Sequence, residues 1–68
     1  MKLFYLDEKE QKHFIGEAPT KIELIDILLN DLKSKFVYIS GQQAEAMITS
    51  STLFSLGKNR YAIEENLI

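Results

Sequence analysis

The single histidine of the chain, His13, follows Glu10 at the Glu-x-x-His spacing that is used to hold metal in di-iron helix bundles. Such a site brings together two of these pairs and two further glutamates from four helices. This chain has one pair, in a stretch whose polar composition predicts a loop, and it has no cysteine. The sequence therefore predicts no metal site and no cofactor.

Four hydroxyl side chains stand together at residues 49–52, in the run Thr-Ser-Ser-Thr. A nucleophilic serine needs a neighbouring base and a third group that orients the base. His13 is distant in the sequence, no serine lies in a G-x-S-x-G motif, and the three glycines form no phosphate-binding loop. We therefore expect a protein that is not an enzyme, and hydroxyls that hydrogen-bond a bend in their own backbone.

The tyrosines suggest a different function, because aromatic rings on an open sheet face can stack on bases. Tyr5, Tyr38 and Tyr61 could lie on one such face, with Lys58 and Arg60 at its border. However, ten acidic residues against eight basic ones give a net charge of −2, and no RNP-like motif is present. Binding of single-stranded nucleic acid is therefore the alternative to the function favoured below.

Residues 20–35 predict the element that must position these side chains, an amphipathic helix. Thr20 and Glu23 have the spacing of a capping box, and Lys33 and Lys35 lie where the helix dipole favours cations. The apolar side chains recur at helical spacing and gather on one side: Ile22, Leu24, Ile25, Leu28, Leu29 and Leu32.

Strand-like segments lie on both sides of this helix. They cover residues 3–6, 13–18, 36–40, 44–49 and 60–64, whereas residues 53–56 form either a short strand or a single turn. Residues 36–40 have the strongest strand composition, and Gly16 weakens its strand or marks a bulge. Residues 42–56 are ambiguous; we prefer a turn at 40–43 and a strand near 44–49.

The predicted fold is a single α+β domain over residues 1–68. Its order is β-β-α-β-β-β, with one helix packed on a small, mostly antiparallel sheet. Alternation along the strands leaves open which sheet face the helix covers, because a register slip of one residue exchanges the two faces.

The predicted strands carry large apolar side chains on both faces, whereas one helix can cover only one of them. An uncovered apolar face is an interaction surface by default. We therefore expect a small protein-interaction module that forms a homodimer or regulates a partner protein, with Phe4, Leu6, Ile27 and Tyr38 as contact residues. In the alternative, residues 42–56 form a second helix that folds over the spare face.

The sequence also predicts where the protein is found. The apolar start of the chain is too short for a signal peptide, and the longest apolar runs span four residues, far below the ~20 that cross a bilayer. We expect no membrane association and a cytoplasmic location. The composition is typical of small proteins of bacteria or their phages.

Overall fold

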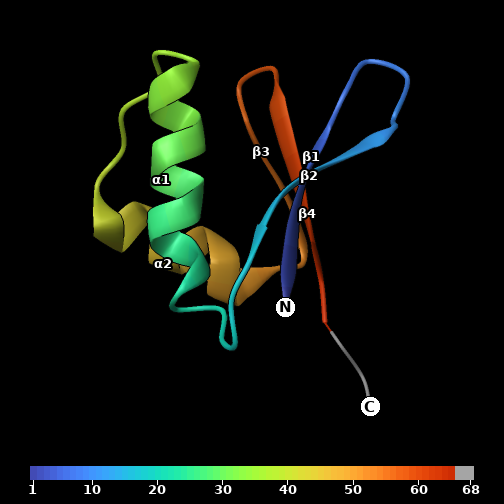
Figure 1. The fold of residues 1–68 in the computed structure, drawn as a ribbon. Coiled ribbons are helices and arrows are strands. Elements are labelled where there is room, and N and C mark those ends of the chain that lie inside the picture. The colour runs from blue at the N-terminus through green and yellow to red at the C-terminus, as the bar shows by residue number, and fades with distance from the viewer. Residues whose placement is uncertain (66–68) are drawn as a thin grey trace.

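The computed structural model describes residues 1–65 and places four strands and two helices in that part of the chain (Figure 1). The strands form one antiparallel sheet in the order β2-β1-β4-β3. The elements in chain order are β1 (Lys2–Leu6), β2 (Lys12–Glu17), α1 (Leu24–Ser34), α2 (Gly41–Ser50), β3 (Leu53–Leu56) and β4 (Asn59–Glu64). The α+β class and the antiparallel sheet are thus confirmed.

The first hairpin, β1–β2, is closed by the carboxylate of Asp7. Its Oδ1 accepts hydrogen bonds from the backbone N–H groups of Lys9 and Gln11, at 2.9 Å each. Beyond this turn the pairing runs regularly as far as Phe4 and Phe14, and then shifts so that Leu3 faces Gly16. Ile15 is the extra residue, so the bulge predicted at Gly16 is confirmed.

Helix α1 begins later than residue 20, where the sequence predicted its start. The hydroxyl of Thr20 accepts a bond from the Glu23 N–H at 3.3 Å, but residues 21–23 form a turn and the helix begins at Leu24. Its far end closes with the Schellman motif, in which the N–H groups of Phe36 and Val37 bond to carbonyls of the last turn.

Two of the predicted strands are wrong. Residues 36–40 form the irregular connection between the helices, and residues 44–49 lie inside α2. The helix is set by its start, because Ser40 and Gln43 form a capping box in which each side chain bonds the other residue's N–H at 3.1 Å. Ala44 and Ile48, four residues apart, supply its buried face.

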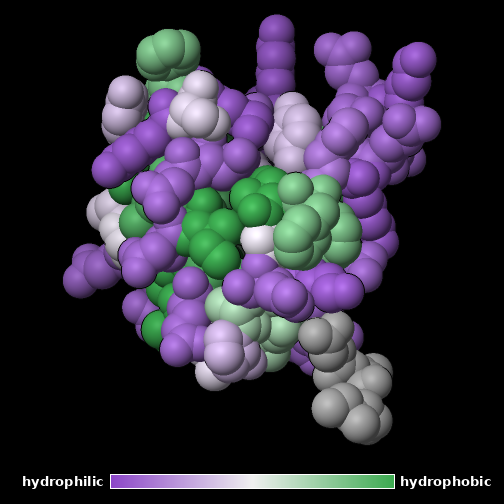
Figure 2. Space-filling view, in the orientation of Figure 1, coloured by the Kyte–Doolittle hydropathy of each residue, from purple (hydrophilic) through white to green (hydrophobic). Residues whose placement is uncertain are grey.

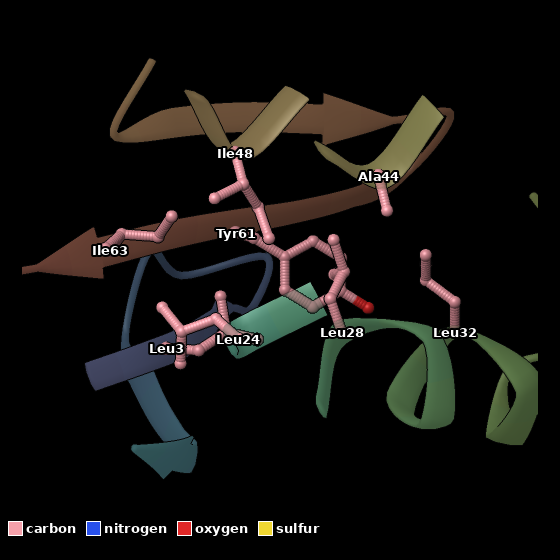
Figure 3. Packing of buried hydrophobic residues seen from close by; sticks show 8 residues of the cluster. All are labelled: Leu3, Leu24, Leu28, Leu32, Ala44, Ile48, Tyr61 and Ile63. Carbon is pink, nitrogen blue, oxygen red and sulfur yellow. The ribbon is translucent and has the colours of Figure 1, made fainter. Parts of the chain in front are cut away.

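Both helices cover the same face of the sheet (Figure 3). Their buried side chains meet Leu3 of β1 and Tyr61 and Ile63 of β4 in one hydrophobic cluster. The remaining members of the cluster are Leu24, Leu28 and Leu32 of α1 and Ala44 and Ile48 of α2. The second helix therefore exists, as the alternative proposed, but it joins the first helix instead of covering the opposite face.

Candidate protein-binding surface

The sheet face that points away from the helices carries a row of apolar side chains, one from each strand. Side chains alternate between the two faces along a strand, so the neighbours of Leu3 and Ile63 point away from the core. The pairing aligns these neighbours across the sheet. They are Phe14 of β2, Phe4 of β1, Ala62 of β4 and Leu53 of β3, which we call the apolar row.

The two ends of the apolar row are exposed. Phe14 is 58% and Leu53 63% accessible, whereas Phe4 is partly buried and Ala62 is buried. The rings of Phe4 and Phe14 meet edge to face, with their centroids 5.8 Å apart. Within residues 1–65 no helix or strand lies over this row. Exposed apolar surface of this kind is typical of an interaction site.

The apolar surface also continues around the edge of the sheet. Figure 2 shows hydrophobic side chains gathered near the centre of the view, over β2 and the adjoining side of α1, with hydrophilic side chains around them. At this junction Ile27 of α1 lies against Gly16, where an added Cβ would be 3.0 Å from the Ile27 Cγ2. Gly16 thus lets helix and strand approach closely.

Charged side chains border the apolar row on both sides, and their signs differ. On the side of the hairpin turn, Lys12 and Arg60 flank Leu6. On the other side, Glu17 and Glu64 flank Lys2. One border therefore carries two positive charges, and the other carries two negative charges around a single positive one.

Three of these border charges, Lys12, Glu64 and Arg60, are paired within the chain. Lys12 forms an ion pair with Glu64, and its Nζ lies 5.7 Å from the centre of the Phe4 ring, so the pair crosses the apolar row. Arg60 donates to Glu10 Oε1 at 3.2 Å and to the carbonyl of Asp7 at 3.1 Å. The Lys12–Glu64 side chains are about half exposed, at 50% and 45%.

The structure brings together only half of the contact residues expected from the sequence. Phe4 and Leu6 lie on the open face. Ile27 points toward Gly16 at the junction of helix and sheet, and Tyr38 lies in the connection between the helices. Phe14 and Leu53 were not among the residues expected from the sequence, although pairing of the predicted hairpin strands places Phe14 close to Phe4.

The three tyrosines do not share an open face. Tyr5 and Tyr61 are neighbours on the face that the helices cover, with ring centroids 5.6 Å apart, and Tyr61 is fully buried. Tyr38 is exposed in the connection 36–40. Of the two basic residues expected beside them, Lys58 lies in the β3–β4 turn and Arg60 on the open face.

Glu10 and His13 do not converge on a common point. The Nε2 of His13 lies 2.7 Å from Asp7 Oδ2, whereas Glu10 contacts Arg60. The hydrogen bond from His13, followed by that from the Gln11 N–H, lowers the pKa of Asp7. Within residues 1–65, no three side chains of the types that bind metals come together.

The hydroxyl groups at the end of α2 bond to their own backbone. Thr49 Oγ1 donates to the Glu45 carbonyl at 2.8 Å, and Ser51 Oγ donates to the Leu53 carbonyl at 2.8 Å. Ser50 Oγ donates to the Met47 carbonyl at 3.2 Å. Thr49 and Ser50 therefore bond to carbonyls within α2, and Ser51 bonds within the bend that follows, where the sequence predicted such bonds.

Neither helix in the described part of the chain has the length and apolar character needed to cross a membrane. Comparison of the chain with protein-family models, with curated proteins and with solved structures finds no match.

Proposed function

We propose that the protein is a non-enzymatic protein-interaction module that associates with itself through the open face of its sheet. The single observation that carries the proposal is the apolar row, with exposed phenylalanine and leucine side chains at its two ends. Burial of apolar surface is the main favourable term in most protein association. A small domain gains stability in the same step, because folding alone buries only about 60% of the surface of so short a chain.

The arrangement of the tyrosines favours a protein partner over a nucleic acid. Tyr61 is buried and bonded to Asp31, so its ring is not available to stack on a base. The net charge of −2 also opposes binding to a phosphate backbone. A nucleic acid is therefore the less favoured, alternative partner.

The proposal is tested by measuring molar mass in solution at rising protein concentration, up to about 1 mM, where an association of only about 4 kcal/mol is half formed. We expect the mass to rise toward that of a dimer. We expect Phe14→Asp to weaken the association by about tenfold or more, because it places a charge on the apolar row.

Phe36→Asp is the matched control, since it makes the same change at an exposed phenylalanine that lies off the open face. It should associate like the unsubstituted protein. A strictly monomeric protein at the highest concentration would overturn the proposal. Binding of a single-stranded RNA in low salt, without any self-association, would overturn it in favour of the nucleic-acid alternative.

A further inference from the structure

The charges that border the apolar row suggest how a partner would be oriented. We propose that the occupant of the open face is a second copy of this chain, stacked face to face about a two-fold axis that runs along the apolar row. This inference rests on the proposed function and specifies the partner and its orientation. Stacked sheets pack about 10 Å apart and keep their strands aligned within about 30°, so opposite rows face one another.

Two in-plane axes could relate stacked copies, and the charges distinguish them. An axis along the strands would place the border with Lys12 and Arg60 over the same border of the second copy, and like charges would meet. An axis along the apolar row reverses the strands, so each basic border lies over an acidic one. Lys12 then faces Glu17 of the second copy, and Arg60 faces Glu64 of the second copy.

The same axis also matches the apolar side chains. Each member of the row lies over its own counterpart, so Phe14 meets Phe14 and Leu53 meets Leu53 of the second copy. Phe14 and Leu53, the two most exposed side chains of the row, are then each buried against their counterparts. Such a contact is isologous, as expected for the commonest symmetric dimers.

The Lys12–Glu64 ion pair inside the chain is compatible with this contact. Lys12 and Glu64 are about half exposed and cross the row over Phe4. An exposed pair of this kind contributes little, so opening it costs little. In the dimer both residues of this pair gain new partners. Lys12 faces Glu17 of the second copy, and Glu64 faces Arg60 of the second copy.

A charge-swap experiment tests the orientation. Lys12→Glu and Glu17→Lys each place like charges opposite one another at two symmetric positions. Each variant alone should dimerise about fivefold more weakly or worse, as expected for two exposed pairs turned from attraction to repulsion. Mixing the two variants restores attraction at both positions, so the mixed dimer should form in preference to either homodimer, as measured by native mass spectrometry with one chain mass-tagged.

Two further proteins act as controls. The double variant Lys12→Glu/Glu17→Lys should dimerise with itself like the unsubstituted chain. Lys33→Glu reverses a charge on the exposed side of α1 and should leave the association unchanged. Circular dichroism of each variant shows whether it keeps the fold.

A second swap separates stacking from pairing along the edge of the sheet. Arg60 and Glu64 lie on the interior strand β4, so a dimer joined edge to edge along β2 would not bring them together. We expect mixed Arg60→Glu and Glu64→Lys to dimerise more tightly than either alone. If only the Lys12–Glu17 swap shows rescue, the dimer is joined at its edges and the inference is overturned.

The inference and the proposed function fail differently. If the unsubstituted chain stays monomeric, the proposed function fails and the orientation falls with it. If the chain dimerises and Phe14→Asp prevents this, but neither swap is rescued by mixing, only the orientation is overturned.

Discussion

Tyr61 joins the sheet to α1 through both its ring and its hydroxyl. The ring is fully buried among the core side chains, and the hydroxyl donates to Asp31 Oδ2 at 2.6 Å. The Nζ of Lys35 reaches the same oxygen at 2.6 Å and lies 4.4 Å from the centre of the Tyr5 ring. Burial of Tyr61, followed by its bond to Asp31, raises its pKa well above the ordinary value of 10.0.

Replacing Tyr61 by phenylalanine tests this contact. We expect Tyr61→Phe to lower the free energy of unfolding by about 1–2 kcal/mol, because the partly buried Asp31 loses a donor. The wild type should also lose stability as the pH rises above 10.0, since Tyr61 ionises there only in the unfolded chain, and the variant should lack this part of the decline. Urea titrations at a series of alkaline pH values measure both effects.

Tyr38→Phe is the matched control, because the Tyr38 side chain is exposed. It should leave both the stability and its alkaline dependence as in the wild type. Equal effects at the two positions would contradict the assigned role of Tyr61.

Asp7 gives the hairpin turn a dependence on acid pH. Its carboxylate accepts bonds from His13 and from the backbone of the turn, and its pKa is lowered from 3.8. This contribution to stability is therefore present above pH 3.8 and is lost as the pH falls through the lowered pKa. We expect Asp7→Asn, which keeps an acceptor but cannot ionise, to show a flatter loss of stability in acid.

Urea unfolding of both proteins between about pH 5 and pH 2 covers the range in which a carboxylate titrates. At the lowest pH, Asp7 of the wild type is neutral, as the asparagine of the variant is at every pH. The difference in stability between the two proteins at that pH therefore contains no contribution from the charge of Asp7. Identical acid profiles would show that Asp7 contributes no charge-dependent stability.

Among the elements, the sequence predicts those whose signals are local and agree with one another. The helix predicted from the apolar spacing in α1 and the loop predicted from the polar stretch before β2 are both found in the structure. The strand predicted at residues 36–40 is wrong because aromatic and β-branched side chains favour strands only where they can pack in a sheet. Here the Schellman motif places Phe36 at φ 60°, and the chain leaves the helix with the Phe36 ring exposed.

Phe36 adopts a left-handed conformation that is unfavourable for its type. Glycine is the usual residue at this position of the motif, and the ring is 83% exposed, so it contributes little packing. We expect Phe36→Gly to raise the free energy of unfolding by about 0.5–1 kcal/mol. The substitution relieves a backbone strain of about 1–2 kcal/mol, but glycine also gives the unfolded chain more entropy, which offsets part of this gain. Thermal and urea unfolding measure the change.

Tyr38→Gly provides the comparison, since Tyr38 does not have a positive φ. It should not stabilise the protein, because glycine there only adds entropy to the unfolded chain. A loss of stability in Phe36→Gly would show that the ring makes a contribution larger than the backbone strain.

At the scale of the whole molecule, the sequence correctly predicts two layers but not how the helices are distributed. The main prediction had a single helix, and only the alternative placed a second helix, over the opposite face; the structure has the second helix on the same face as the first. The connection between the helices, residues 35–40, can span at most about 20 Å. This is too short to carry α2 from the end of α1 around the sheet edge to the middle of the opposite face, so α2 packs beside α1.

This distribution also explains why the residues of the open face were only partly predicted. Alternation along β1 alone places Phe4 and Leu6 on one and the same face of the sheet. Phe14 and Leu53 belong to the same surface only because the order β2-β1-β4-β3 aligns them across four strands. Strand order is a long-range property, which the composition of a single segment does not determine.

The apolar row predicts that association depends on both edges of the sheet. Leu53 lies on β3, at the opposite edge from Phe14, and is 63% exposed. We expect Leu53→Asp to weaken self-association by about tenfold or more, with a free energy of unfolding within about 0.5 kcal/mol of the wild type, as for surface substitutions. Ile22→Asp, at an exposed isoleucine before α1, is the control and should associate normally. If Leu53→Asp associates like the wild type while Phe14→Asp does not, the contact is confined to the β2 edge and does not extend along the row.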